Sequence, residues 1–350
     1  MYKFNFFQKF TIAIPLNRFW FVLFVSILFF SLDTVQPQSL ERVDLSGYAQ
    51  GTTWHITYYQ KNKVVSTTQI DSVLCVIDSS LSIYKPYSKI IEFNNSKEGI
   101  AIDFHFKKVI QKSLDTYHQT QGFFDITVLP VIEAWGFGVS AHHKASDPVV
   151  VDSLLKCVSS NYLWLQGNFL GKSKPCVKID VNGIAQGYSV DVLADFLARR
   201  KIRNYLIELG GEIIVKGRKQ PGDEPFIIGI ESPAKTGELT IRKMLELDSG
   251  AITTSGNYRK YYESKAGKIS HIINPLTGYP AKNELISTTV YAKDAITADA
   301  YDNALMVMGL KKALQFIEAR KDISAYFIYQ KSDGHIADTA SSKFYRLIKN

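Results

Sequence analysis

Cysteine is scarce in this chain of 350 residues. The three cysteines, Cys75, Cys157 and Cys176, show no metal-ligand spacing, which argues against a thiolate-bound zinc site. They cannot all pair with one another, and the sequence does not show that any two of them lie close together. Cys157 and Cys176 could form one disulfide in an oxidising compartment, but buried free thiols are the favoured interpretation.

Clustered positive charge is also missing. The formal net charge is +8, yet the only run of three basic residues is Arg199-Arg200-Lys201. Because nucleic-acid-binding proteins gather basic residues into a patch or stripe, scattered charge favours an ordinary solvated surface. The sequence also lacks internal repeats, low-complexity tracts and the G-x-G-x-x-G dinucleotide fingerprint. With 46% hydrophobic residues, we expect a globular protein without a nucleic-acid partner.

The N-terminus carries an apolar run that indicates export. Lys3, Lys9 and Arg18 precede residues 19–32, which are uncharged and rich in Phe, Leu and Val. This pattern is typical of a signal peptide or a membrane anchor, although the run is short for a full span. No clear small-x-small cleavage site and no lipobox cysteine follow it. We expect the chain to lie on the periplasmic side of the cytoplasmic membrane, anchored or released. The expected boundaries are 1–33 for this segment, 34–45 for a polar linker and 46–350 for the folded domain.

Strand and helix periodicities mix along the rest of the chain. Trp54, Ile56 and Tyr58 alternate with polar residues, which predicts a half-buried strand. Residues 188–200 have the apolar stripe of an amphipathic helix. Further helices are expected at 69–82, 107–119 and 294–308, and further strands at 176–179, 205–209, 226–230, 285–292 and 325–330. The absence of a regular βαβ order favours the α+β class.

Two segments upstream of residue 200 are candidate ligand contacts. In residues 180–188, Gly183 and Gly187 lie between an expected strand and an expected helix, where backbone N–H groups suit a phosphate. Asp125 and Thr127 lie among aromatic residues, an arrangement that fits a flat ligand such as a flavin or a nucleobase. Taken alone, the glycines more often serve turns and packing, and the aromatic residues more often form core.

Residues 253–303 combine three kinds of chemistry. Thr254-Ser255-Gly256 offers a hydroxyl beside a glycine, which suits a close backbone approach to phosphate. His271 is the side-chain type best suited to move protons near neutral pH, although a lone histidine is structural about as often. Asp299 and Asn303 would share one face of a helix and present hard oxygen ligands.

The order of these motifs is more specific than any one of them. In chain order they are Gly51-Thr52-x-Trp54, Ser82-x-Tyr84, Gly122-x-x-Asp125-x-Thr127, Trp135-Gly-Phe137, Asp180-x-x-Gly183-x-Ala-x-Gly187-Tyr188, Gly210-Gly211-Glu212, Gly229-Ile-x-x-Pro233, Thr254-Ser255-Gly256, Ser270-His271-x-x-x-Pro275-x-Thr277-Gly278 and Ala298-Asp299-Ala300. This ordered set resembles the ApbE family of flavin transferases (FAD:protein FMN transferases) from about residue 46 to residue 309. The resemblance implies one large α+β catalytic domain, related to the T-fold, with a mixed sheet flanked by helices.

The resemblance also implies a reaction and a set of ligand contacts. Family members bind FAD and Mg2+, cleave the pyrophosphate, attach FMN to a threonine of a target protein through a phosphoester bond and release AMP. The partner would be a protein with an acceptor threonine, such as a flavin-carrying subunit of a membrane redox complex. The residues implied to contact FAD are Gln50, Tyr84, Phe124, Asp125, Thr127, Asp180, Gln186, Ser255, Gly256 and Ile273. Gln50 stands where methionine is common, and Gln186 where lysine or glutamate is frequent.

The implied catalytic and metal-binding residues lie mostly in the second half of the chain. His271 would be the general base on the acceptor hydroxyl, and the Gly183 carbonyl and Asp299 would bind Mg2+. Asn303 stands where the family usually has a threonine ligand; its amide oxygen is still a hard ligand, and Asp302 could be recruited instead. Because of this departure, an FAD-binding carrier and a Mg2+-dependent FAD pyrophosphatase, which releases FMN and AMP, remain alternatives.

Overall fold

The computed structural model describes residues 40–349 except 140–146, 233–239, 258–260 and 265–266. The predicted export segment, residues 1–33, lies outside these ranges, so its role and the location of the chain stay predictions. Within the described ranges, no helix is both long and apolar enough to cross a membrane.

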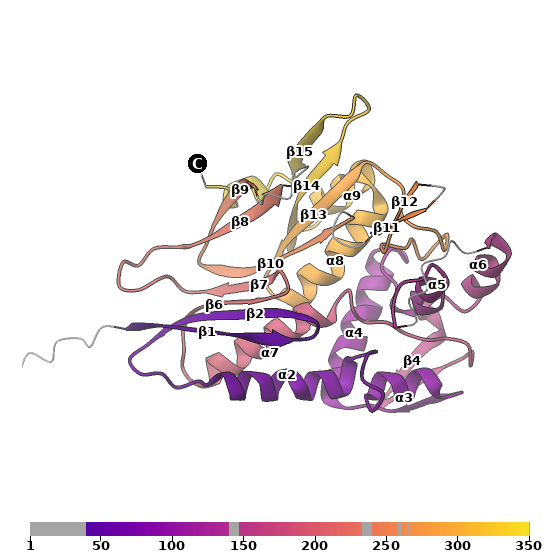
Figure 1. Ribbon diagram of the computed structural model, residues 1–350, viewed down its shortest axis with the longest axis horizontal. Helices are drawn as coiled ribbons and strands as arrows, with labels where there is room; N and C mark the ends of the chain where they lie inside the picture. The colour runs from indigo at the N-terminus through magenta and orange to yellow at the C-terminus, as the bar shows by residue number, and fades with distance from the viewer. Residues whose placement is uncertain (1–39, 140–146, 233–239, 258–260, 265–266, 350) are drawn as a thin grey trace, which may run out of the picture. The chain divides into compact units, whose positions relative to one another are not determined.

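An eight-stranded sheet forms the centre of the folded domain (Figure 1). Its strand order is β1-β2-β6-β7-β10-β13-β14-β15, and every neighbouring pair is antiparallel. The strands are β1 (Glu41–Ala49), β2 (Thr52–Gln60), β6 (Asn204–Leu209), β7 (Glu212–Lys216), β10 (Ser249–Gly256), β13 (Leu285–Ala292), β14 (Ile323–Gln330) and β15 (Ile336–Ala340). The predicted α+β class is confirmed, whereas the sheet is antiparallel rather than mixed.

Smaller sheets and helices surround the central sheet. The small sheets are β3-β5-β4, from β3 (Gly99–Ala101), β4 (Leu163–Gln166) and β5 (Phe169–Lys172); β8 (Phe226–Ser232) with β9 (Thr240–Leu247); and β11 (Tyr261–Ser264) with β12 (Gly267–Ser270). The helices are α2 (Thr67–Leu81), α3 (Lys89–Asn95), α4 (Phe104–Gln119), α5 (Leu129–Ala134), α6 (Pro148–Leu155), α7 (Ala185–Arg199), α8 (Ala295–Met308) and α9 (Leu310–Glu318). Short 3-10 helices lie at η1 (Ile126–Val128), η2 (Ser160–Tyr162) and η3 (Phe344–Leu347).

The two faces of the central sheet pack against different partners. Ile207 of β6 and Ala251 of β10 join the core formed with α7 and the N-terminal helices, and Figure 1 shows α7 and α8 beside this face. Ile252, one residue further along β10, belongs to the core formed with the β8–β9 pair and η3. Because successive side chains of a strand point to opposite faces, one strand supplies both cores.

Helix starts follow capping rules that can be read in the sequence. Ser66 and Gln69 form a reciprocal capping box at α2, while the Asp103 and Asp294 side chains accept backbone N–H bonds at α4 and α8. These contacts satisfy N–H groups that have no partner inside the helix. The six longest predicted elements, helices 69–82, 107–119, 188–200 and 294–308 and strands 285–292 and 325–330, are each found within a few residues of the expected bounds.

Two boundary predictions are wrong. β1 begins at Glu41 and pairs with β2 along its whole length, so residues 41–45 belong to the sheet and not to the predicted linker. Residues 176–179 are not a strand. Val177 and Ile179 do alternate with exposed neighbours as a strand would, but the backbone of Ile179 bonds to the Asn94 side chain. Alternation shows which side chains are buried and does not reveal the backbone partner.

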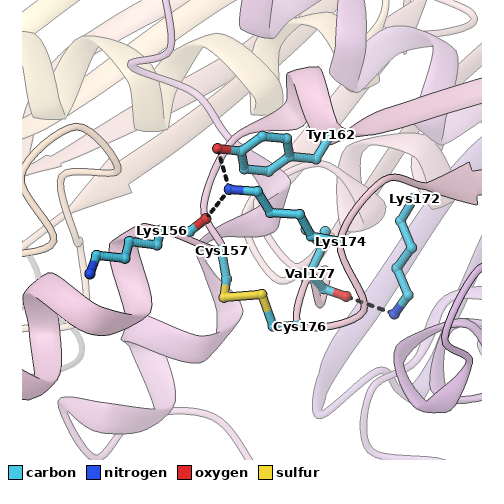
Figure 2. Close-up of a disulfide and its surroundings, with 7 residues drawn as sticks. All are labelled: Lys156, Cys157, Tyr162, Lys172, Lys174, Cys176 and Val177. Atoms are coloured by element: carbon cyan, nitrogen blue, oxygen red, sulfur yellow. Dashed lines mark hydrogen bonds between the residues drawn. A yellow bond between two sulfur atoms is a disulfide. The ribbon is translucent and has the colours of Figure 1, made fainter.

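The prediction of buried free thiols is wrong as well. Cys157 and Cys176 form a disulfide with 5.7 Å between their Cα atoms, and Cys75 is a free thiol that is exposed. Figure 2 shows that Lys174 reinforces the same junction, because its Nζ donates to the Lys156 carbonyl and the Tyr162 hydroxyl, both at 2.8 Å. Pairing depends on the approach of two Cα atoms far apart in sequence, which only the fold determines.

Candidate active site

A cleft of about 890 Å3 runs between the helices and the end of the central sheet. Its walls come from the β1–β2 turn, α2, the segment before η1, the loop before α7, β10, the segment after β12, and α8. The predicted site residues that line it are Gln50, Tyr84, Phe124, Asp125, Asp180, Gly183, Gln186, Ser255, Gly256, His271, Ile273, Asp299 and Asn303. Thr127 is the predicted ligand contact that does not line the cleft. The fold therefore gathers residues spread over some two hundred and fifty positions of sequence into one site.

Asp125 is held in a socket of hydrogen-bond donors. Its Oδ1 accepts the Thr127 N–H at 2.8 Å, the Thr127 hydroxyl at 2.6 Å and the Ser160 hydroxyl at 2.7 Å. Its Oδ2 accepts the Ser160 N–H at 3.1 Å. Burial raises the pKa of Asp125, and these bonds oppose that rise. Thr127 is fully buried and positions the Asp125 carboxylate. Ser160 was not foreseen from the sequence.

The loop before α7 and the aromatic residue Tyr84 form an adjacent wall. Asp180 Oδ1 accepts the Asn182 N–H at 2.8 Å, and the Asn182 amide donates to the Tyr84 hydroxyl at 3.4 Å. Burial and the nearby Asp180 raise the pKa of Tyr84. Tyr84 is nevertheless 58% exposed, which leaves an aromatic residue available to a flat ligand.

Gln50 and Gln186 lie at the β1–β2 turn and at the start of α7. Gln50 adopts a left-handed backbone with φ of 52°, and its Nε2 donates to the Ser189 hydroxyl at 3.0 Å. This bond ties the turn at one rim of the cleft to α7. Gln186 lies close to Gly210, where an added Cβ would be 3.1 Å from the Gln186 Nε2. A glycine at Gly210 therefore leaves room for the Gln186 amide beside the cleft.

One end of the cleft is acidic. Asp299, Asp302 and Glu212 all line it, and Asp299 and Asp302 are 3% and 2% exposed. Burial raises the pKa of Asp299 to about 7. The Gly187 N–H, which donates to Asp299 Oδ2 at 2.8 Å, opposes that rise. Burial, Asp299 and Glu212 raise the pKa of Asp302 well above its ordinary value. Acids that share a desolvated site repel each other unless a proton or a cation is bound.

The donor set at this end fits a hard divalent cation. Asp299 and Asn303 are one turn apart on α8, so both side chains leave the same face. Gly183 packs against Asn303, because a Cβ at Gly183 would be 3.1 Å from the Asn303 Nδ2. Asp302 Oδ1 is buried without a hydrogen-bond partner. Carboxylate, amide and backbone carbonyl oxygens are the ligands that Mg2+ and Ca2+ prefer.

This set differs from a site made only of acidic or histidine side chains. Over the described ranges, no three His, Cys, Asp or Glu residues are placed to hold a metal together. The predicted set of Gly183, Asp299 and Asn303 contains one carboxylate, an amide and a carbonyl. Asn303 Oδ1 accepts the Ser255 hydroxyl at 3.0 Å, which connects the β10 end of the cleft to the same group.

His271 directly follows β12 in the chain and lines the same cleft. Its ring is in edge-to-face contact with Phe137, with 6.3 Å between centroids. The backbone next to it is fixed by the Ala281 N–H, which donates to the Ile272 carbonyl at 2.8 Å, and by a bridge between Ile273 and Pro280. A proton acceptor, the hydroxyl and glycine of Ser255-Gly256, and a hard-cation donor set thus share one cleft. This combination can position a phosphate ester and take a proton from an attacking hydroxyl.

Solved structures of one class of enzyme, the flavin transferases, have this fold. The structure of "Flavin Transferase ApbE from Vibrio cholerae" superposes with a TM-score of 0.79 at 33% identity, covering 88% of this chain and 99% of that chain. The apo flavinyl transferase ApbE of Pseudomonas stutzeri superposes with a TM-score of 0.81 at 27% identity, covering 89% of this chain and 98% of that chain. The chain belongs to the ApbE family, whose sequence model matches residues 50–327.

Curated relatives agree with the structural comparison. A protein of Vibrio cholerae named FAD:protein FMN transferase is 35% identical over 337 residues, which is 93% of this chain and 98% of the relative. A protein of the same name from Haemophilus influenzae is 32% identical, over 86% of this chain and 90% of the relative. The family predicted from the ordered motifs is confirmed.

Proposed function

We propose that this protein transfers FMN from FAD to a threonine hydroxyl of a target protein, with Mg2+ bound and AMP released. The observation that carries the proposal is the single cleft that contains His271, Ser255-Gly256, the Asp125 socket and the Asp299–Asn303 donor set. The relatives named FAD:protein FMN transferase cover nearly the whole folded domain, which supports the same activity.

The residues divide into binding, proton-transfer and cation-binding groups. Asp125 and Tyr84 line the part of the cleft that suits the rings of FAD, and Ser255 and Gly256 suit its pyrophosphate. Asp299, Asn303 and the Gly183 carbonyl would hold Mg2+, with Asp302 beside them. Bound there, Mg2+ would neutralise charge on the pyrophosphate and on the departing AMP.

The transfer step needs a base because a threonine hydroxyl is a weak nucleophile at neutral pH. His271 accepts the hydroxyl proton while the oxygen forms a bond to the FMN phosphorus. The bond between that phosphorus and the oxygen of the AMP phosphate breaks, so AMP leaves with the bridging oxygen. The product is a phosphoester between FMN and threonine.

The test is the mass of an acceptor after incubation with the full chain, FAD and Mg2+. We expect an acceptor threonine to gain the mass of one FMN, and the His271→Ala variant to bind FAD but lose transfer. A family enzyme that labels the same acceptor serves as the positive control. An acceptor that stays unmodified beside a labelled positive control would contradict the proposal.

Two other activities give different products in the same assay. A Mg2+-dependent FAD pyrophosphatase would release free FMN and AMP without an acceptor, and an FAD-binding carrier would show FAD binding without turnover. Asn303 in place of the usual family threonine is the observation that keeps these alternatives relevant.

We also propose that the domain works in an oxidising compartment outside the cytoplasm. The Cys157–Cys176 disulfide supports this location, because such bonds persist mainly in exported proteins. The basic and apolar character of residues 1–33 supports it too. Protease added to intact spheroplasts should digest the domain; protection until the membrane is lysed would contradict an external location.

A further inference from the structure

The loop formed by residues 173–184 has neither helix nor strand, yet it forms one wall of the cleft. It runs from the end of β5 at Lys172 to the start of α7 at Ala185. Val177, Ile179 and Val181 are fully or almost fully buried, and the residues between them are not. The loop is therefore half-buried like a strand, although none of the described strands pairs with it. Something else must satisfy its buried backbone groups.

Asn94, at the end of α3, takes the place of a neighbouring strand. Its Nδ2 donates to the Ile179 carbonyl at 2.9 Å, and its Oδ1 accepts the Ile179 N–H at 2.8 Å. One side-chain amide thereby makes the two hydrogen bonds that a paired residue makes in an antiparallel sheet. Asn94 is 7% exposed, so these bonds are shielded from water and costly to lose.

Lys172 makes a second connection between α3 and the same loop. Its Nζ donates to the Val177 carbonyl at 2.8 Å, as Figure 2 shows, and to the Phe93 carbonyl at 3.2 Å. The ammonium also lies 4.8 Å from the centre of the Phe93 ring. A buried lysine is costly unless its donors are used, and here two of them bind backbone carbonyls.

The loop contacts the substrate side of the cleft immediately after these anchors. Asp180 follows Ile179, and its N–H donates to the Ile126 carbonyl at 2.8 Å, next to Asp125. Three residues later, Gly183 packs against Asn303 of α8. The position of Ile179 therefore sets the distance of the loop from both the Asp125 socket and the cation donor set.

We propose that Asn94 and Lys172 are positioning residues for FAD and Mg2+, acting through the 173–184 loop. This inference rests on the proposed function. The first residues of the loop are held by other contacts: Cys176 by the disulfide and Lys174 by its bond to the Lys156 carbonyl. The half that carries Asp180 and Gly183 is held by Asn94 and Lys172, beside the backbone bond from Asp180 to Ile126.

The test compares Asn94→Ala and Lys172→Met with the parent full chain. We expect the KM for FAD and the half-saturating Mg2+ concentration to rise about tenfold or more, which corresponds to the loss of one or two buried hydrogen bonds. At saturating FAD and Mg2+, kcat should stay within about threefold, since neither residue touches the reacting atoms. Hydrogen exchange of a peptide covering 177–184 should accelerate in both variants.

Asn204→Ala is the matched control. Asn204 Oδ1 also accepts a backbone N–H, that of Arg218, at 3.1 Å. Asn204 begins β6, whereas Gly210, which lines the cleft, follows the other end of that strand. Asn204→Ala should lower the melting temperature without changing either constant. Unchanged constants and exchange in Asn94→Ala and Lys172→Met would overturn the inference, and so would an equal change in Asn204→Ala.

The two proposals fail in different ways. If the parent binds FAD but transfers nothing, the FAD dissociation constant from flavin fluorescence replaces KM, and a tenfold rise in the variants still supports the positioning role. If the parent binds no FAD, both proposals are overturned. If Asn94→Ala does not accumulate as folded protein, Lys172→Met gives the same measurements with most of the apolar side chain kept.

Discussion

The two long walls of the cleft are built in different ways. β10 and α8 form one wall, and their backbones are fixed by ladder and helix hydrogen bonds. The 173–184 loop forms another wall, and its backbone is fixed by the side chains of Asn94 and Lys172, by a disulfide and by one backbone bond from Asp180 to Ile126. A regular element tolerates loss of a side chain without losing its backbone bonds. The irregular wall is less tolerant, because side chains from neighbouring elements supply bonding partners for its backbone.

Asp299→Ala should have the largest effect, and it acts on the regular wall. Loss of a buried carboxylate from the cation donor set should lower Mg2+-dependent transfer on the order of a thousandfold. The α8 backbone should persist, so the melting temperature should change little or rise. Transfer rates across a Mg2+ titration give the measurement. Asp152→Ala, which removes an exposed carboxylate on α6, is the control. Mg2+-dependent transfer that survives in Asp299→Ala would exclude Asp299 as a ligand.

Removal of the disulfide should affect the irregular wall. The double change Cys157→Ser and Cys176→Ser opens a link between residues separated by 19 positions, and should lower the free energy of unfolding by about 3 kcal/mol. FAD affinity should fall less than in Asn94→Ala, because the disulfide holds only the start of the loop. Urea unfolding and FAD titration measure the two effects. Equal stability of the oxidised parent and the double variant would show that the disulfide does not stabilise this wall.

Gly187→Ala tests the contact between α7 and α8 behind the regular wall. An added Cβ would be 2.4 Å from the Ala295 carbonyl oxygen and 2.7 Å from the Asp299 Cβ, so the helices would have to separate. Overpacking of this kind should cost about 1–3 kcal/mol and weaken Mg2+ binding through Asp299. Melting curves and Mg2+ titrations should change together. Loss of stability with unchanged Mg2+ affinity would show that Asp299 does not depend on this contact.

The pH dependence of stability should show the smallest effect, and it reports on Lys172. Burial and the nearby Lys178 lower the pKa of Lys172 to about 8, from an ordinary 10.5. Between these values the unfolded chain binds more protons than the folded one, so the free energy of unfolding should rise with pH. Below pH 8 this contribution should be constant. Urea midpoints from pH 7 to 10 should rise more for the parent than for Lys172→Met, and parallel curves would contradict the pKa shift.

The sequence predicted the regular wall much better than the irregular one. Asp299 and Asn303 were placed on one helix face from their spacing alone, because the helical period fixes which residues share a face. In the irregular wall, the same reasoning gave a strand at 176–179 that does not exist. The alternation of Val177 and Ile179 was real, but a side-chain amide 85 positions away supplies the backbone partner.

The sequence did not reveal what several contributors to the site do. Ser160, which was assigned no role from the sequence, donates its hydroxyl to Asp125. Glu212 belonged to the Gly210-Gly211-Glu212 motif, but its place at the acidic end of the cleft follows only from the packing of β7 beside α8. Thr127 was predicted to contact FAD; it does not line the cleft, and its hydroxyl donates to Asp125. Motif order located the cleft, but it did not distinguish a residue that touches a ligand from one that supports it.

By itself, the sequence determined the family, the α+β class, the main helices and strands, and a set of site residues of which all but Thr127 line the cleft. These depend on local periodicity and on an ordered set of motifs, both of which are written along the chain. The tertiary structure alone decided the Cys157–Cys176 bond, the burial of Asp302 and the attachment of the 173–184 loop to Asn94 and Lys172. Each of these depends on how closely the fold brings groups together and how far it excludes water, which local periodicity does not encode.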